Sequence, residues 1–537
     1  MTTGWNYAEI WERIADKFPD AQAQVQGDRR INWAQFDRRA DGLASTLLAA
    51  GLGHQDKVAL YLYNSPEYLE GVFASFKAGL VPVNTNYRYI DDELVYLWDN
   101  ADALAVVFHG AFSEIIERIR SRVSRVRLWL WVDDGSGPCP SWATPYEDAA
   151  AAADGRVVGP VARSGDDILM IYTGGTTGMP KGVMWRQDDL LRVTSATGIP
   201  MLLQDPDDVG GYDALLEQLA APGLPGVPAC PLMHGTGWFT AHMYLVQAGS
   251  VVSLVDRKFN VIELLDTIER EGVGALTIVG DAFAKPIVAA LDAEPGRWDL
   301  SSLLLVSSSG VMWSEPVKEA MLRHHPGMLL VDAFSSSEAI GLGQSVSAAG
   351  AEAATARFSL GENAKVISED GRIVEPGSGE KGRVAVRGYT PIGYYKDPEK
   401  SAATFVTIEG ARYSMPGDWA TVEADGSINL LGRGSVCINT AGEKVFPEEV
   451  EEALKEHPAV YDAVVVGVPD EKFGEAITAI VEPVPGVTAV ESDLIDHVRT
   501  RLAAYKAPKR VLTVDSIGRA PNAKVDYARW KTYAASA

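Results

Sequence analysis

Residues 167–172 form a short, mostly apolar segment that runs directly into a loop of glycines and threonines ending in Pro180-Lys181-Gly182. Glycine lets backbone amides approach a phosphate closely, threonine hydroxyls donate further hydrogen bonds, and lysine supplies positive charge. We therefore interpret residues 173–182 as a triphosphate-binding loop at the end of a buried strand, although plain surface loops also have such a composition. The loop is not the usual P-loop, because Gly182 follows the lysine where that motif has Ser or Thr.

Helix and strand patterns alternate along most of the chain. Apolar residues recur at helical spacing between Trp33 and Leu48, and this pattern ends at Gly51. Short apolar runs of the strand type lie at residues 57–63, 102–108, 126–132, 251–255, 274–279 and 303–307. Such alternation predicts an α/β fold with mainly parallel sheets.

Two later stretches differ in character from this pattern. Between residues 361 and 429, short strands separated by Gly, Asp and Pro predict a small β-rich unit. A helix that begins at Pro447 and a strand at 462–468 then predict a small α+β domain. Because 537 residues exceed what one hydrophobic core usually organises, we expect several domains. These are a large multi-subdomain N-terminal domain and a smaller C-terminal domain of about a hundred residues.

Composition excludes some classes of protein. A formal charge of −24 and a pI near 4.8 argue against a general nucleic-acid binder, which normally presents a basic face. Cys139, Cys230 and Cys437 are too far apart in sequence to indicate a disulfide framework or a metal cluster, and a reducing cytoplasm is the expected setting. The first residues carry no signal-peptide pattern, and no apolar run approaches the ~20 residues of a membrane helix.

The segment YTGGTTGMPKGV at residues 172–183 resembles the signature loop of the adenylate-forming (AMP-binding) superfamily. That superfamily includes acyl-CoA synthetases, aryl-CoA ligases, firefly luciferase and peptide-synthetase adenylation domains. Segments similar to its other motifs follow in order at 231–235 (PLMHG), 308–313, 334–338 (FSSSE), 393–398 (GYYKDP), 416–418, 432–433, 442–444 and 519–524 (RAPNAK). The amino-acid sequence of these segments is most similar to that of actinobacterial acyl-CoA synthetases that act on fatty acids and steroid side chains.

The resemblance implies an ATP site. Lys181 and the loop before it are expected to hold the β- and γ-phosphates, and Glu338 with the Thr177 hydroxyl is expected to position Mg²⁺. Asp418 and Arg433 are expected to contact the ribose. The other nucleotide contacts that the resemblance implies are Thr173, Gly174, Gly175, Thr176, Gly178, Ser309, Gly310, Val311, Asp332, Ala333, Phe334 and Ser337.

The resemblance also implies catalytic and coenzyme A contacts. Lys524 is expected to bridge the carboxylate and the α-phosphate during adenylation. His234 is expected either to gate the carboxylate or only to fill space. The resemblance further implies an N-terminal domain at 1–432, a hinge at 433–436 and a mobile C-terminal domain at 437–537. After adenylation the C-terminal domain is expected to rotate about this hinge. It would then present to coenzyme A a segment formed by Ala441, Gly442 and Lys444. Gly442 as a simple turn residue is the alternative.

Three positions depart from the family pattern. Ser435 stands where the hinge usually has Asp or Lys, and Pro416 replaces the threonine before Gly417 and Asp418. Ala523 replaces the glycine before the terminal lysine. Because none of these changes removes a charged catalytic group, we expect the activity to survive them.

These features predict an acyl-CoA synthetase. It would use ATP, Mg²⁺ and coenzyme A to activate a small-molecule hydrophobic acid, of medium or long chain or with a bulky, steroid-like body. The acyl pocket is expected to be apolar, with contributions from Met233, His234, Trp238, Phe239, Met312 and Trp313. A luciferase-like enzyme, or another adenylate-forming enzyme with a different acceptor, is the alternative. A homodimer without nucleic-acid or integral-membrane partners is also expected.

Overall fold

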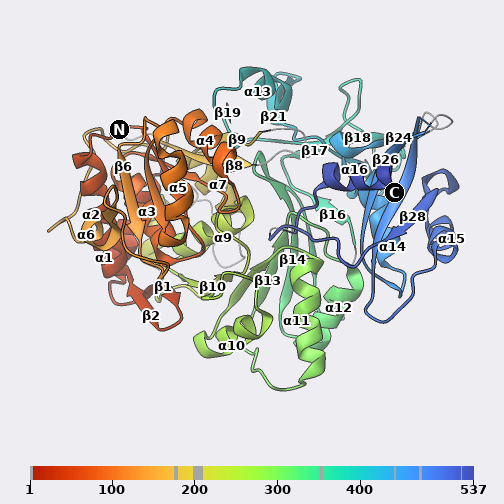
Figure 1. Cartoon of the computed structure of the whole chain (residues 1–537), viewed down its shortest axis with the longest axis horizontal. Coiled ribbons are helices and arrows are strands. Elements are labelled where there is room, and N and C mark those ends of the chain that lie inside the picture. The colour runs from red at the N-terminus through yellow and green to blue at the C-terminus, as the bar shows by residue number, and fades with distance from the viewer. Residues whose placement is uncertain are drawn as a thin grey trace.

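The computed structural model describes residues 4–173, 179–197, 210–350, 355–440, 443–470, 474–521 and 523–537. It has the predicted α/β architecture, with two large sheets flanked by helices and a smaller C-terminal part. In Figure 1 the C-terminal part is blue and lies against the green middle of the molecule. Within the described residues, no helix has the length and apolar character needed to cross a bilayer.

The first sheet is parallel at its centre and has the strand order β19-β9-β8-β4-β3-β5-β6-β7. Strand β3 explains why the predicted strand at 57–63 is almost continuously apolar. Its Val58 and Leu60 enter one hydrophobic core, whereas Ala59 and Tyr61 enter the core on the other face. The strands are β3 (Lys57–Tyr61), β4 (Val81–Asn84), β5 (Ala103–His109), β6 (Leu128–Val132), β7 (Thr144–Pro145), β8 (Ile168–Thr173), β9 (Lys181–Arg186) and β19 (Gly393–Tyr394).

Apart from one antiparallel strand at its outer edge, the second sheet begins with parallel strands and continues into the antiparallel β-rich region. Its parallel half contains β1 (Gln22–Gln26), β10 (Pro225–Pro228), β11 (Ser250–Ser253), β12 (Ala275–Ile278), β13 (Leu305–Ser309) and β14 (Leu329–Ser336). The antiparallel members are β2 (Arg29–Asn32), β15 (Ala339–Ser347), β16 (Arg357–Leu360), β17 (Ala364–Ile367), β18 (Lys381–Arg387), β20 (Phe405–Ile408), β21 (Ala411–Ser414), β22 (Asp418–Val422) and β23 (Ser427–Arg433). The predicted β-rich unit therefore extends this sheet instead of standing apart from it.

The third sheet belongs to the C-terminal part and follows directly after a short 3₁₀ turn at Gly434–Val436. It contains β24 (Ile438–Thr440), β25 (Glu443–Val445), β26 (Val460–Asp470), β27 (Gly474–Pro483) and β28 (Arg510–Thr513), with helices α14 (Pro447–Lys455), α15 (Glu491–Arg501) and α16 (Tyr527–Ser536). The change of sheet thus falls between Arg433 and Ile438, which spans the expected hinge.

Helices of the large part cover both of its sheets. Helices α1, α2, α3 and α9 share one core with the first sheet, and α10, α11 and α12 pack on the outer face of the second (Figure 1). The bounds are α1 (Tyr7–Lys17), α2 (Trp33–Ala49), α3 (Pro66–Lys77), α4 (Asp91–Asn100), α5 (Ser113–Ile119), α6 (Tyr146–Ala150), α7 (Gln187–Thr197), α8 (Tyr212–Gln218), α9 (Gly235–Val246), α10 (Val261–Glu271), α11 (Asp281–Ala293), α12 (Glu315–His324) and α13 (Pro398–Thr404).

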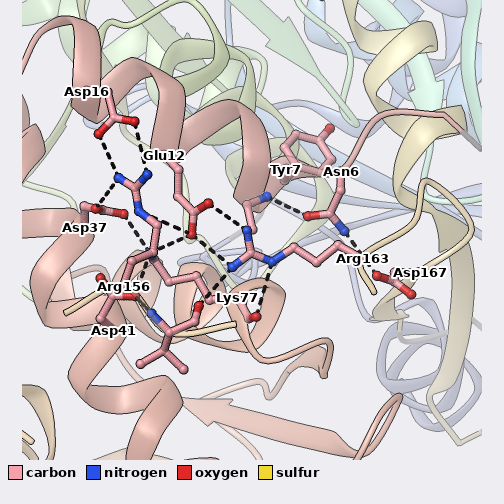
Figure 2. A network of polar contacts seen from close by, with 12 residues as sticks. Asn6, Tyr7, Glu12, Asp16, Asp37, Asp41, Lys77, Arg156, Arg163 and Asp167 are labelled. Atoms are coloured by element: carbon pink, nitrogen blue, oxygen red, sulfur yellow. Dashed lines mark hydrogen bonds and ion pairs between the residues drawn. The ribbon is translucent and has the colours of Figure 1, made fainter. Parts of the chain in front are cut away.

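A buried cluster of charges ties helices α1, α2 and α3 together (Figure 2). The ammonium group of Lys77, which is fully buried at the end of α3, contacts one carboxylate oxygen of each of three residues. The distances are 2.9 Å to Glu12, 2.7 Å to Asp37 and 2.8 Å to Asp41. Arg163 completes the cluster with two bonds to Glu12, at 2.7 and 3.0 Å. Each buried charge is therefore paired, which is the condition for burying charges without a large free-energy cost.

Candidate active site

A cavity of about 1420 Å³ lies where the two large sheets, helix α9 and the C-terminal part meet. Residues from distant parts of the sequence line it together. They include His234 at the start of α9, Glu338 after β14, Asp418 on β22 and Arg433 on β23. Lys524 reaches the same cavity from the C-terminal part. The structure thus brings the predicted catalytic and ribose-contacting side chains into one place.

The carboxyl ends of two neighbouring parallel strands form one wall of this cavity. Ser309 ends β13 and pairs in register with Ala333 on β14, and this end of a parallel sheet is where ligands of α/β proteins usually bind. The predicted nucleotide contacts on this wall all line the cavity, namely Ser309, Gly310, Val311, Asp332, Ala333, Phe334 and Ser337. The Phe334 ring packs against the Phe358 ring in a tilted arrangement, with 5.5 Å between the ring centres.

Asp418 and Arg433 form a pair on adjacent strands. The Arg433 Nε donates to Asp418 Oδ1 at 3.2 Å, and Asp418 raises the pKa of Arg433 above its ordinary value. The other carboxylate oxygen of Asp418, Oδ2, is buried and has no hydrogen-bond partner among the described residues. A buried acceptor without a partner is costly, so this oxygen fits a ligand that donates hydrogen bonds, as a ribose hydroxyl does.

Glu338 presents its carboxylate to the cavity from the turn after β14. Its Oε1 accepts a hydrogen bond from the Tyr394 hydroxyl at 2.8 Å, and its backbone carbonyl accepts one from Ser414 at 2.6 Å. These bonds fix the residue, and its second carboxylate oxygen makes no hydrogen bond to another described residue. A single carboxylate beside a phosphate site fits Mg²⁺, which takes few protein ligands when phosphates and water supply the rest.

Lys524 lies on a tight turn that other groups hold in place. The Ala520 amide donates to the Lys524 carbonyl at 3.0 Å. Arg519 donates to the Ala523 carbonyl at 3.0 Å and pairs with both oxygens of Asp462, at 2.6 and 2.8 Å. The role of Arg519 in positioning this turn was not predicted, although the residue opens the RAPNAK motif.

The electrostatic environment of Lys524 suits an anionic substrate. Its side chain is accessible from the cavity, yet enough protein surrounds it that burial lowers its pKa, and the charge of Arg433 lowers it further. Glu338 and Asp418 act in the opposite direction. A carboxylate or phosphate in this cavity would therefore meet two neighbouring cations whose repulsion it relieves.

Ala523, which replaces the expected glycine, adopts a left-handed backbone conformation with φ of 58°. For a residue with a side chain this conformation costs about 1 kcal/mol or more. The Ala523 methyl is buried, and it packs in the core formed by β12, β13 and helix α11 of the large part. Burial of the methyl offsets part of that cost, and the substitution leaves Lys524 in the cavity.

His234 is uncharged in this environment. Burial lowers its pKa to about 3, with smaller contributions from the charges of Lys524 and Arg88. A neutral imidazole can lie beside a carboxylate and a lysine without adding a further charge. Arg88, on the loop after β4, also lines the cavity and was not predicted from the sequence.

One face of helix α9 forms a side wall of the cavity. Thr236, Phe239, Thr240 and Met243 lie at helical spacing on this face and line the cavity. Together with Met233 and Met312, which also line it, they provide an apolar surface for an acyl group. Phe239, Met233 and Met312 were predicted, whereas Thr240 and Met243 were not.

Two predicted acyl-pocket residues lie elsewhere. Trp238 is on the opposite face of α9, where its Nε1 donates to His242 Nε2 at 3.0 Å inside the helical core. Trp313 is completely buried in the core under the second sheet. Neither is among the described residues that line the cavity, so the structure does not place them in the predicted acyl pocket. Trp238 and Phe239 are neighbours in sequence, but the helical period of 3.6 residues directs their side chains to different faces of α9.

Lys181 also has a different neighbourhood from the one predicted. Its ammonium group pairs with Asp397 at 2.7 Å, and it is not among the described cavity-lining residues. Thr173, directly before the glycine-rich loop, does line the cavity. The predicted contacts Gly174, Gly175, Thr176, Thr177, Gly178, Ala441 and Gly442, and the side chains of Ser435 and Lys444, lie outside the described residues.

Comparison with known families assigns both parts of the chain. The AMP-binding enzyme family matches residues 11–395, and the AMP-binding enzyme C-terminal domain matches residues 449–524. This chain belongs to the AMP-binding enzyme family. It is similar to a medium/long-chain-fatty-acid–CoA/3-oxocholest-4-en-26-oate–CoA ligase of Mycolicibacterium smegmatis, which is 40% identical over 98% of this chain and 95% of the relative. A 3-oxocholest-4-en-26-oate–CoA ligase of Rhodococcus rhodochrous is 38% identical, with the same two coverages.

Solved structures agree with this AMP-binding enzyme in fold. An anthranilate CoA ligase in complex with anthranoyl-AMP superposes with a TM-score of 0.82 at 22% identity, covering 99% of this chain and 98% of that one. ATP-bound MatB from Rhodopseudomonas palustris has a TM-score of 0.80 at 24% identity, covering 99% of each chain. The fold and the family of this protein are therefore shown by independent comparisons.

Proposed function

We propose that this protein is an acyl-CoA synthetase. In its first step the carboxylate of the acid attacks the α-phosphate of ATP, which forms an acyl-adenylate and releases pyrophosphate. In its second step the thiol of coenzyme A attacks the acyl carbonyl, which forms the thioester and releases AMP. The observation that carries this proposal is the convergence of Lys524, His234, Asp418, Arg433 and Glu338 around one cavity.

Each of these residues has a defined task in adenylation. Lys524 neutralises and aligns the two anions that react, and the neutral His234 lies beside the carboxylate without repelling Lys524. Asp418 accepts hydrogen bonds from the ribose, and Arg433 supports it from the adjacent strand. Glu338 and Thr177 would hold Mg²⁺, which supplies charge neutralisation at the phosphates when it is bound.

The second step requires the C-terminal part to leave the position seen here. Lys524 lines the cavity to which we assign adenylation, so coenzyme A needs another segment to guide its thiol. We assign that task to Ala441, Gly442 and Lys444, as the family resemblance suggests. The expected boundaries at 432 and 436 place the moving joint between β23 and β24.

The substrate is a hydrophobic acid of medium or long chain, or one with a bulky fused-ring body. The apolar wall of α9 supports this assignment, and so do the names of the two ligases from Mycolicibacterium smegmatis and Rhodococcus rhodochrous. These relatives are named as coenzyme A ligases, which gives no support to a luciferase-like reaction. A cytoplasmic location and a homodimer stay predictions.

A coenzyme A ligation screen tests the proposal directly. Acetate, straight acids of increasing length, aryl acids, steroid acids with a short side chain and free amino acids are each incubated with ATP, Mg²⁺ and coenzyme A. We expect acyl-CoA, AMP and pyrophosphate in equal amounts, with acetate a very poor substrate. Pyrophosphate release without any acyl-CoA from any acid would contradict the assignment of coenzyme A as acceptor.

Substitution of Met243 is expected to change the preferred acyl length. Each buried methylene contributes about 0.8 kcal/mol, or roughly fourfold in kcat/KM. Met243→Trp fills part of the cavity, so we expect the ratio of kcat/KM for dodecanoate to that for hexanoate to fall by about tenfold or more. Trp238→Ala is the matched control on the other face of α9. It should lower the free energy of unfolding by about 3–5 kcal/mol and leave this ratio unchanged. If Trp238→Ala changes the ratio and Met243→Trp does not, Trp238 contacts the acyl group after all.

A further inference from the structure

Glu448 stands at the joint between the two parts of the molecule. It is the second residue of α14 in the C-terminal part, and its carboxyl lies against the last residues of β23 in the large part. Gly432 has φ of 122°, and a Cβ placed there would stand only 2.2 Å from the Glu448 Oε2. The Arg433 amide donates to the other oxygen, Oε1, at 3.3 Å. The missing Gly432 side chain thus makes room for this carboxyl beside the expected hinge.

The charges around this carboxyl make its ionised form costly. Its Oε2 is buried and has no hydrogen-bond partner among the described residues. Burial, together with the nearby carboxylates of Glu451 on α14 and Asp418 on β22, raises the pKa of Glu448 to about 8, although its backbone hydrogen bonds act in the opposite direction. Arg433 on β23 is the facing cation, but its side chain is already paired with Asp418 at 3.2 Å. Tyr527, which donates to Glu451 at 3.0 Å, is a further titratable neighbour of Glu448.

We propose that Glu448 is a proton-dependent latch that holds the C-terminal part, and with it Lys524, in the adenylation position. In its protonated form the carboxyl fits the space above Gly432 without placing a third negative charge beside Asp418 and Glu451. When the C-terminal part moves away to allow thioester formation, the carboxyl enters water and releases its proton. The inference rests on the proposed function, because it requires that movement.

The direction of the pH effect follows from proton counting. In the latched position Glu448 binds a proton up to about pH 8, whereas in water its pKa returns to its ordinary value of 4.5. Between these values the latched form carries one proton more than the released form. The equilibrium constant for latching therefore falls by about tenfold per pH unit as the pH rises through this interval, and it levels off above pH 8.

Fluorescence energy transfer between a dye on the large part and one on the C-terminal part can measure this equilibrium from pH 6 to pH 9. The test compares the wild type, Glu448→Gln and the control Glu456→Gln. The glutamine side chain introduced by Glu448→Gln would keep the shape and the Oε1 acceptor but cannot ionise. Glu456 lies at the other end of the same helix, and its side chain is 54% exposed. We expect the latched fraction to fall with pH in the wild type and in the control, and to stay constant in Glu448→Gln.

A second readout separates the latch from the proposed function. At pH 8 the Glu448→Gln variant should form acyl-adenylate at least as fast as the wild type, but convert supplied acyl-adenylate to acyl-CoA several-fold more slowly. If Glu448→Gln shows the pH dependence of the wild type, the latch is refuted, while ligation and the response of energy transfer to coenzyme A remain. If energy transfer never responds to ATP or coenzyme A and no acyl-CoA forms, the proposed function fails with it.

Discussion

Replacing Lys524 with Ala is expected to slow acyl-adenylate formation by about 10²–10⁴-fold, the range seen when one group that stabilises developing charge is removed. Lys524 lies in the cavity with His234, Asp418 and Arg433, and under the proposed function it contacts both the carboxylate and the α-phosphate. Arg433 remains in the variant, but its pairing with Asp418 at 3.2 Å directs it to the ribose side. Single-turnover measurement of pyrophosphate release from ATP and dodecanoate checks this result.

The second half-reaction provides the contrast. Thioester formation from supplied acyl-adenylate and coenzyme A should change far less in Lys524→Ala, because Lys524 is expected to be away from the site during that step. Lys531→Ala is the matched control, since this lysine lies in the same part of the chain with its side chain 49% exposed and paired with Glu475. Equal losses in both half-reactions of Lys524→Ala would show that the residue acts in more than adenylation.

Replacing Lys77 with Ala is expected to lower the free energy of unfolding of the N-terminal helices by about 3–5 kcal/mol, because it leaves buried carboxylates without their partner. In the native structure its ammonium group contacts Glu12, Asp37 and Asp41 at 2.7–2.9 Å (Figure 2). Arg163 still pairs with Glu12 in the variant. We expect Asp41 to lose the most stabilisation in the variant. Burial already raises its pKa, and the Lys77 charge that lowers this pKa is removed.

Native-state amide hydrogen exchange of α1, α2 and α3 measures this effect without assuming that the whole chain unfolds in one step. Arg122→Ala is the control, because its pair with Asp92 is on the surface, with side chains 47% and 88% exposed. Such exposed pairs contribute about 0–1 kcal/mol. A loss in Lys77→Ala no larger than that of Arg122→Ala would mean that the buried cluster adds no net stability.

Local sequence determined the secondary structure and the architecture well. Strand Lys57–Tyr61 buries alternate residues in two cores, so its continuous run of apolar residues correctly predicted a central strand. The pattern between Trp33 and Leu48 became helix α2, which ends at Ala49. These predictions succeeded because periodicity of 2 or 3.6 residues is a local property of the backbone. The motifs around Glu338, Asp418, Arg433 and Lys524 likewise identified residues that meet at one cavity.

Only the tertiary structure decided which side chains face the cavity. Trp238 and Met243 lie on the same helix and are both apolar, but the packing of α9 against the first sheet turns Trp238 into the core and Met243 toward the ligand space. Proximity to a motif in sequence cannot distinguish the two faces of a helix. The same holds for the buried position of the Glu448 carboxyl. It depends on the space left by Gly432, which is 16 residues earlier in the chain and on a strand of the large part. The sequence thus determined which elements and which chemical groups the protein has, whereas long-range packing decided their orientation, their burial and therefore their protonation.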